Sequence, residues 1–179
     1  MKFTSFAKNA VAIGILSGLS MAASATTTML GAASVGTPLS FNSGLVPPGG
    51  FNDIFTFSLP ANGGSGYSVI NFPVPGFFNT LLATASLISN PDGILFNEDD
   101  SVKTTVVSSA NKISFAWGAE PAGNYYLNVA GITNGPFGGL YNGAITVTAV
   151  PEPESYAMLL AGLGIMGAIA MRRNKSKSS

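Results

Sequence analysis

The chain has 179 residues, of which only 9% are charged, against about 25% in an average soluble domain. It holds 22 glycines but no Cys and no His, which excludes disulfides and thiolate nucleophiles and removes the commonest general base and metal ligand. Residues 26–149 carry two basic and six acidic side chains, a net charge of minus four. A segment so poor in Lys and Arg lacks the electrostatic footprint of a nucleic-acid-binding protein, so we exclude that class.

Residues 1–25 have the three parts of a secretory signal peptide. MKFTSFAK carries two lysines, AVAIGILSGLSMAA is apolar, and Ala23-Ser24-Ala25 is a small-x-small cleavage site. We therefore expect cleavage after Ala25. The alternative is an uncleaved membrane anchor, which is disfavoured because the apolar run is short for a span and ends in a good cleavage site.

Residues 26–149 are expected to form short strands, since VPPGG, PANGGSG, NPDG, EPAG and TNGPFGG each supply a Gly or Pro reason to turn. The predicted strands are Pro38–Phe41, Phe51–Leu59, Tyr67–Phe72, Leu81–Ser89, Ile94–Asn97, Lys103–Ser108, Lys112–Ala119, Asn124–Gly131 and Leu140–Val150. Short strands at this spacing, with no helical period between them, predict an all-β domain, an antiparallel β-sandwich or jelly roll. Residues 26–48 are weakly patterned, and we expect them to include a mobile lead-in.

The strand FNDIFTFSLP places a carboxylate in line with aromatic side chains. Alternation puts Phe51, Asp53, Phe55, Phe57 and Leu59 on one face. An unpaired buried charge is very costly, so Asp53 must lie near the rim or be held by several donors. We favour a structural Asp that accepts backbone N–H bonds from a neighbouring turn. Calcium ligation is the alternative, and it would need oxygen ligands from other loops.

A second group of carboxylates lies in the segment NPDGILFNEDDS. Asp92, Asp99 and Asp100, with Asn97 and Glu98, offer oxygen ligands for calcium, but the register of an EF-hand loop is missing. A solvated acidic turn is the favoured interpretation. We therefore predict no metal site, with Asp53 and these three aspartates as the weak candidates.

The same carboxylates make a poor glycosidase pair, because neighbours on one loop rarely face each other across a sugar. A Ser–Lys nucleophile using Lys103 or Lys112 has no motif to support it. With no His or Cys, we expect no enzyme activity and no cofactor.

Aromatic residues keep carbohydrate binding open as an alternative function. On KISFAWGAE, alternation groups Ile113, Phe115 and Trp117, which indicates core packing first. Tyr125 and Tyr126 point to opposite faces, so we expect at most one to face the core and the other to lie at the rim.

Tyr156–Met171 is a stretch of sixteen uncharged residues near the end of the chain. As a helix it would be about 24 Å long, short of a hydrocarbon core of about 30 Å, so it can cross only with local thinning or snorkelling flanks. The basic cluster Arg172, Arg173 and Lys175 stops transfer and stays on the cytoplasmic side, which holds the body outside. A buried amphipathic core helix is excluded, because the run is apolar on all faces.

The segment before this run is expected to be extended. Pro151 and Pro153 prevent a preceding element from continuing into the helix, and they leave Glu152 where an enzyme could grip it. Pro151-Glu152-Pro153, the short helix SYAMLLAGLG and the terminal Arg-Arg cluster closely resemble the PEP-CTERM sorting signal of Gram-negative bacteria that make extracellular polysaccharide.

This resemblance implies that residues 150–179 form a sorting signal recognised by an exosortase, an intramembrane transpeptidase-like cysteine enzyme that removes the tail. The implied course is export, transient anchoring in the inner membrane by a C-terminal transmembrane helix with the body periplasmic, and final placement at the cell surface or in the extracellular matrix.

FNDIF also fits the Phe-x-Asp-x-Phe motif of one subgroup of PEP-CTERM proteins. PAGNYY and LNVAGITNGPFGGLYNGAITVTAV resemble the last two strands of that subgroup, and residues 50–150 look like the bacterial pre-peptidase C-terminal sandwich domain. The resemblance implies a non-catalytic β-sandwich. Two functions remain open: a structural or adhesive surface protein of an exopolysaccharide or biofilm matrix, and a carbohydrate- or calcium-binding module. Besides the exosortase, extracellular polysaccharide is the candidate partner.

Overall fold

The computed structural model describes residues 24–149 and 157–167. The chain divides into two compact units, Met1–Ala149 and Val150–Ser179, which are described separately. The strands of the first unit are β1 (Thr27–Ala32), β2 (Leu39–Asn42), β3 (Gly49–Leu59), β4 (Gly64–Asn71), β5 (Thr80–Ser89), β6 (Ser101–Val107), β7 (Lys112–Trp117), β8 (Gly123–Thr133) and β9 (Tyr141–Thr148). The described part of the second unit is one short helix, residues 157–167.

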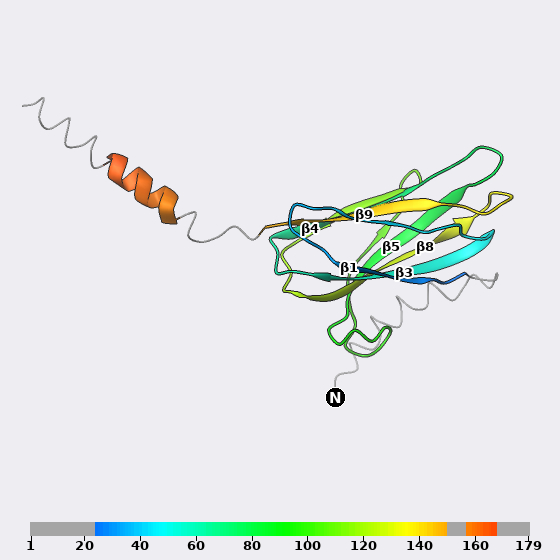
Figure 1. Cartoon of the computed structure of the whole chain (residues 1–179), viewed down its shortest axis with the longest axis horizontal. Helices are drawn as coiled ribbons and strands as arrows, with labels where there is room; N and C mark the ends of the chain where they lie inside the picture. The colour runs from blue at the N-terminus through cyan, green and yellow to red at the C-terminus, as the bar shows by residue number, and fades with distance from the viewer. Residues whose placement is uncertain (1–23, 150–156, 168–179) are drawn as a thin grey trace, which may run out of the picture. The chain divides into compact units, whose positions relative to one another are not determined.

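The strands form two sheets that lie as two layers (Figure 1). One sheet has the order β1-β3-β8-β5-β6 and the other the order β2-β9-β4-β7. Every strand pair in them is antiparallel except β1 with β3, which is parallel. The prediction of a mostly β domain rich in antiparallel pairs is confirmed.

The core lies between the two sheets and is rich in aromatic rings. Alternating residues of β3 point inward, and Phe51, Asp53, Phe55, Phe57 and Leu59 are all buried, as their spacing predicts. Rings from opposite sheets meet there, with centroids 5.3 Å apart for Phe51 and Tyr141 of β9. Contacts of this kind add stability beyond the area they bury, so they lock the two layers together.

Strand β1 was not predicted, whereas β2 corresponds to the predicted strand Pro38–Phe41, so residues 26–48 contribute one strand to each sheet. Strand β1 pairs with β3 from Thr27↔Ile54 onward, and β2 pairs with β9. The side chains of β1 are mostly exposed, because this strand lies at the edge of its sheet. Its sequence TTMLGA therefore lacks the apolar alternation that marks a half-buried strand.

The predicted strand Ile94–Asn97 is also wrong, since these residues belong to the loop between β5 and β6. Leu95 packs on a small cluster of Ile54, Ile88 and Tyr126 on the outer face of the five-stranded sheet. Phe96 has a positive φ of 64°, in the left-handed region and outside the extended range of a non-glycine strand residue. The apolar residues of this loop cover a sheet face instead of forming a strand.

The remaining eight predicted strands are present, with each end shifted by three residues at most. Tyr125 and Tyr126 do point to opposite faces, but both are buried, at 1% and 3% exposure. The prediction of a rim tyrosine is therefore wrong. Tyr126 is covered by the loop that was expected to be a strand.

Candidate functional site

The structure describes only the middle of the expected sorting segment. Residues 157–167 are helical, and every one of them is exposed. The expected recognition residues Pro151, Glu152 and Pro153 and the basic cluster Arg172, Arg173 and Lys175 lie outside the described residues. Among the residues that are described, no helix has the length and apolar character needed to cross a membrane. The stretch expected to span, Tyr156–Met171, extends past the described helix at both ends.

Asp53 is almost fully buried, at 1% exposure. Its carboxylate accepts hydrogen bonds from Thr26, just before β1, and from Tyr141 of β9. Its Oδ1 accepts the backbone N–H of Thr26 at 3.1 Å and the Thr26 hydroxyl at 2.6 Å. Its Oδ2 accepts the phenolic O–H of Tyr141 at 2.6 Å. The expectation that several donors hold Asp53 matches this geometry, although the backbone donor comes from the entry into β1 and not from a turn.

Burial of the phenol, and then the charge of Asp53 and its hydrogen bond, raise the pKa of Tyr141 far above its usual range. The proton therefore stays on Tyr141, which is the donor in this hydrogen bond. Neither Thr26 nor Tyr141 was identified from the sequence, because a Thr before an edge strand and a Tyr in the last strand give no local signal of a shared partner.

The aspartates of the loop between β5 and β6 hold that loop together. Asp92 accepts the N–H of Ile94 at 2.8 Å and the side-chain amide of Asn97 at 2.7 Å. Asp100 accepts the N–H of Phe96 at 2.7 Å and the Tyr126 hydroxyl at 3.0 Å. Within residues 24–149 and 157–167, no three acidic, His or Cys side chains are grouped so that they could bind a metal ion. The two aspartates thus bind groups of their own loop, and Asp100 also joins the loop to Tyr126 of β8.

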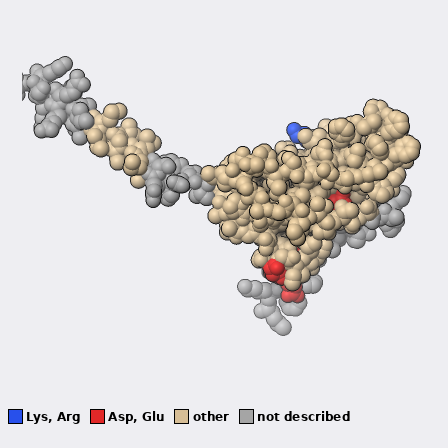
Figure 2. Space-filling model, in the orientation of Figure 1, with Lys and Arg blue, Asp and Glu red and all other residues tan. Residues whose placement is uncertain are grey.

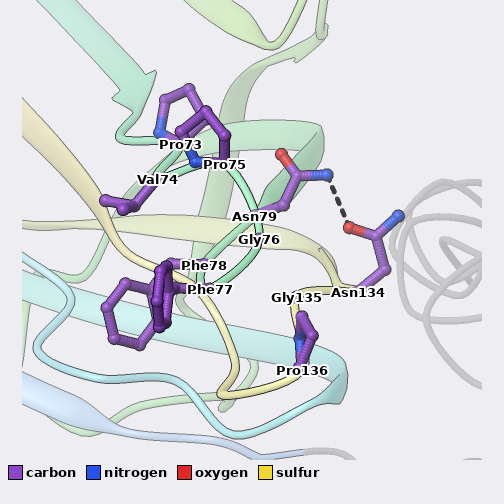
Figure 3. A pocket seen from close by; sticks show the side chains of 10 residues that line it. All are labelled: Pro73, Val74, Pro75, Gly76, Phe77, Phe78, Asn79, Asn134, Gly135 and Pro136. Carbon is purple, nitrogen blue, oxygen red and sulfur yellow. Dashed lines mark hydrogen bonds between the residues drawn. The ribbon is translucent and has the colours of Figure 1, made fainter.

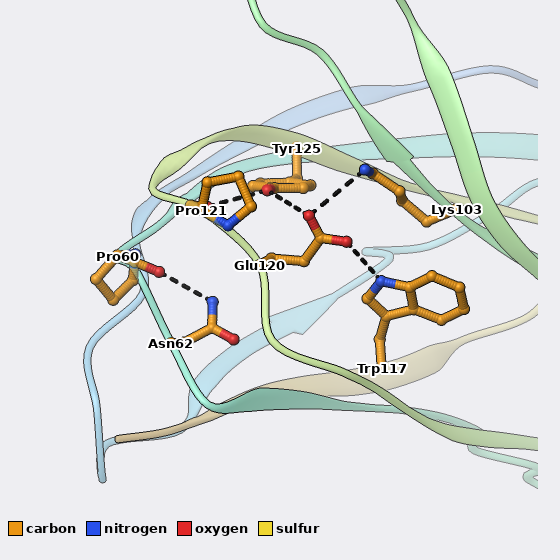
Figure 4. A network of polar contacts seen from close by, with 7 residues as sticks. All are labelled: Pro60, Asn62, Lys103, Trp117, Glu120, Pro121 and Tyr125. Atoms are coloured by element: carbon orange, nitrogen blue, oxygen red, sulfur yellow. Dashed lines mark hydrogen bonds and ion pairs between the residues drawn. The ribbon is translucent and has the colours of Figure 1, made fainter. Parts of the chain in front are cut away.

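A polar network centred on Glu120 lies at one end of the body (Figure 4). The Glu120 carboxylate accepts the Trp117 indole N–H at 2.6 Å and the Tyr125 hydroxyl at 3.2 Å, and it lies 3.4 Å from the Lys103 ammonium. Its side chain is only 8% exposed. Sequence reasoning treated Glu120 as a turn residue, although its spacing of three residues from Trp117 could have suggested the contact.

Opposing effects act on the Glu120 carboxyl. Burial alone would raise its pKa, but the indole hydrogen bond, the Lys103 charge and the Tyr125 hydroxyl together lower the pKa below its ordinary 4.5. Burial, followed by the nearby Glu120 charge, raises the pKa of Tyr125 to about 12. These shifts keep the Glu120 carboxyl charged and the Tyr125 phenol protonated near neutral pH, which preserves the hydrogen bond between them.

An open hollow of about 330 Å³ lies between the loop of residues 73–79 and the loop of residues 134–136 (Figure 3). The Asn79 side-chain amide donates to Asn134 Oδ1 at 2.6 Å and ties the two loops together. Beside the hollow, Phe77 and Phe137 stack with ring centroids 6.0 Å apart, and both are more than half exposed. Paired exposed aromatics beside amide side chains offer one apolar and one hydrogen-bonding surface to a ligand.

The family match found for this chain lies near its C-terminus. Residues 149–174 match the PEP-CTERM protein-sorting motif. This motif implies a protein that is exported, held at the membrane for a time, and sorted by an exosortase to the cell surface. The resemblance of Pro151-Glu152-Pro153 and the following residues to this signal is thereby confirmed, and the match extends over residues 149–174.

The body is similar, at low identity, to several solved structures. It shares 16% identity with the pre-peptidase C-terminal domain of collagenase from Bacillus anthracis, covering 67% of this chain and 94% of that one at a TM-score of 0.38. It shares 15% with the g-type lysozyme inhibitor PliG of Aeromonas hydrophila, with coverage of 71% and 100% and a TM-score of 0.36.

For CorA, a surface-associated copper-binding protein of Methylomicrobium album BG8, the identity is 8%, the coverage 70% and 100%, and the TM-score 0.40. TM-scores of this size carry no argument about function. No curated protein matches the chain.

Proposed function

We propose that this protein is a non-enzymatic component of an extracellular polysaccharide or biofilm matrix, with a structural or adhesive role. The observation that carries the proposal is the sorting motif at residues 149–174, which directs the body to the outside of the cell. An N-terminal signal peptide cleaved after Ala25 would begin this route, and a membrane-spanning C-terminal helix would hold the protein until an exosortase cuts.

The body's surface suits an extracellular matrix. Figure 2 shows a face on which charged side chains are few and scattered, in line with the 9% of charged residues in the chain. A surface of uncharged hydroxyl and amide groups hydrogen-bonds to polysaccharide without the salt dependence of ionic contacts. The polar networks of Asp53 and Glu120 are internal and support the fold, which favours a scaffold over an enzyme.

Membership of the Phe-x-Asp-x-Phe subgroup is part of the same proposal. Phe51, Asp53 and Phe55 supply the motif, and the reason for its Asp is the interaction with Tyr141 and Thr26 described above. In this interpretation the motif specifies a packing arrangement of β3 and contacts within the chain, and no external ligand.

Replacement of Pro151, Glu152 and Pro153 by Ala tests the sorting step. The triple variant should remain in the inner membrane at full length, while Glu98→Gln, an exposed change in the loop between β5 and β6, should reach the surface like the wild type. Normal trimming and surface display of the triple variant would contradict the proposal.

A second candidate function is a carbohydrate-binding module, favoured by the exposed pair Phe77 and Phe137 beside the hollow. Calorimetry with the producing organism's polysaccharide should then give saturable binding. This binding should be lost in the double variant Phe77→Ala/Phe137→Ala and retained in Phe72→Ala, a change at another exposed ring.

Calcium binding is tested by the same calorimetric method. Saturable calcium binding that disappears in Asp92→Asn with Asp100→Asn would instead make the acidic loop a metal site.

A further inference from the structure

Asp53 is a buried carboxylate that is held only by neutral donors. It is 1% exposed, and its three hydrogen bonds come from one amide and two hydroxyl groups. In the described part of the chain the ion pair is Lys103 with Glu120, at a separate site. Burying a carboxylate without a cation costs free energy, because neutral hydrogen bonds only partly replace the solvation of a full charge.

Two of the three hydrogen bonds come from Thr26, which is the first residue after the expected signal-peptide cleavage site. The backbone nitrogen of Thr26 lies 3.1 Å from Asp53 Oδ1, and the Thr26 hydroxyl lies 2.6 Å from the same oxygen. The carbonyl of Thr26 accepts the N–H of Ile54 at 2.8 Å. Thr26 is therefore anchored to β3 by bonds that do not involve Ala25 or any earlier residue.

We propose that Asp53 is the binding site for the amino terminus of the mature chain. The proposal rests on signal-peptide cleavage after Ala25. Hydrolysis breaks the C–N bond between Ala25 and Thr26: the oxygen of water joins the Ala25 carbonyl carbon to give a carboxylate, and the Thr26 nitrogen gains protons to become an ammonium group. That nitrogen already lies at hydrogen-bond distance from Asp53, so a neutral hydrogen bond becomes an ion pair without movement of the strand.

Cleavage also removes contacts, and their size decides the net effect. Ser24 donates its N–H to the Gly50 carbonyl at 3.0 Å and accepts the N–H of Asn52 at 2.9 Å, and both bonds are lost with the signal peptide. These are bonds between neutral groups at the end of an edge strand, where water replaces them at small cost. The new bond joins two full charges at a buried carboxylate and is about twice as strong as a neutral one. The mature chain is therefore the more stable form.

The consequence is a link between export and folding. Before cleavage Asp53 is held by an amide, and after cleavage by a cation, so the two-sheet core reaches full stability only once the signal peptide has been removed. The ligand of the Phe-x-Asp-x-Phe strand is then the chain's own terminus. This accounts for an acidic residue on the otherwise apolar inward face of β3.

The test uses the full chain exported in a bacterial host, in the wild-type form and with one Ser inserted between Ala25 and Thr26. N-terminal sequencing should find Thr26 first in the wild type and the inserted Ser first in the variant. The insertion keeps every side chain of the mature chain. The Thr26 nitrogen, however, is part of a peptide bond to the inserted Ser, as it is to Ala25 before cleavage, and carries no charge. We expect the variant's Tm to be lower by about 4 °C or more. The same insertion in an Asp53→Asn background should leave Tm unchanged.

Equal Tm values for the two forms, an equal shift in the Asp53→Asn background, or a mature terminus other than Thr26 would overturn the proposal. If the Asp53→Asn variant does not fold, the rate at which the terminal amine is acylated tests the proposal instead. At neutral pH an acylating reagent should modify the wild-type terminus about tenfold more slowly than the terminus of the Ser-insertion form, because the carboxylate holds the ammonium in its charged state. Equal rates would overturn the proposal. The sorting function rests on residues 149–174 and would be unaffected.

Discussion

Tyr141 of β9 donates a hydrogen bond of 2.6 Å to the buried carboxylate of Asp53 on β3, and this bond joins the two sheets from inside the core. The Tyr141 ring also stacks on Phe51, with centroids 5.3 Å apart, and meets Phe55 edge-on at 6.2 Å. One tyrosine thus serves both the aromatic packing and the polar contact between the layers. Substitution can separate these two contributions.

Tyr141→Phe keeps the ring contacts and removes the hydroxyl. We expect a loss of about 1 to 3 kcal/mol in the free energy of unfolding, because Asp53 Oδ2 is left without its donor in a buried position. Tyr126→Phe is the matched control, since its hydroxyl reaches Asp100 in a partly exposed loop, and it should cost less. Urea denaturation of both variants measures the difference. A Tyr141→Phe variant as stable as the wild type would show that the bond contributes nothing.

The stability of the body should fall at alkaline pH. Burial, followed by nearby carboxylate charge, raises the pKa of Tyr125 to about 12, and burial raises the pKa of Tyr67 to about 12 as well. The same two causes raise the pKa of Tyr126 and Tyr141 still further. The folded chain keeps phenolic protons that the unfolded chain loses from pH 10 upward.

This contribution to stability is therefore complete below pH 10 and is lost as pH rises through 12. Unfolding free energies measured by urea titration at a series of pH values check the prediction. Stability that stays level from pH 9 to pH 12 would contradict the burial of these hydroxyl groups.

Glu120→Gln should destabilise the body by about 1 to 2 kcal/mol, because the charge-assisted bonds from Trp117 and Tyr125 become neutral. Lys103→Met is the control. It removes an ion pair whose lysine is 26% exposed and should cost about 1 kcal/mol or less. Trp117 is the chain's one tryptophan, so its fluorescence reports unfolding at the network itself. If Lys103→Met costs more than Glu120→Gln, the carboxylate is not the centre of the network.

Gly143 of β9 allows the Phe41 ring to lie directly on the backbone. A Cβ at this position would fall inside the van der Waals contact distance of that ring, which is held in the core. Gly143→Ala should therefore cost about 1 to 3 kcal/mol through overpacking. Gly118→Ala, where nothing lies within 4 Å of the added carbon, should be nearly neutral. Thermal unfolding of the two single variants compares them, and equal Tm values would refute the packing argument.

The strands that could be predicted are those with one buried face. Alternation identified β3 and its inward residues, because period two follows directly from the pleat. Strand β1 was not predicted, because its side chains are exposed at a sheet edge and show no apolar alternation. Ile94–Asn97 was wrongly predicted as a strand, because the apolar residues of this loop cover a sheet face. Sequence patterns give period and turn positions but not which distant elements meet.

The same limit applies to the polar sites. Asp53 was recognisable as a residue that needs donors, since a charge on an aromatic face has few other solutions. Its partners were not recognisable, because Thr26 and Tyr141 lie 27 and 88 residues away along the chain. By contrast, the sorting motif could be predicted from the sequence and is matched over residues 149–174, because its Pro-Glu-Pro segment, apolar run and basic cluster follow one another in the sequence.

The central claim is that an exosortase removes the tail and releases the body to the surface. The most direct test is the intact mass of the protein recovered from the cell surface of the producing organism. The account predicts a chain that begins at Thr26 and lacks residues 157–179, with full-length tail retained when the exosortase is inactivated. A surface protein whose mass still includes the tail with Arg172, Arg173 and Lys175 would contradict it.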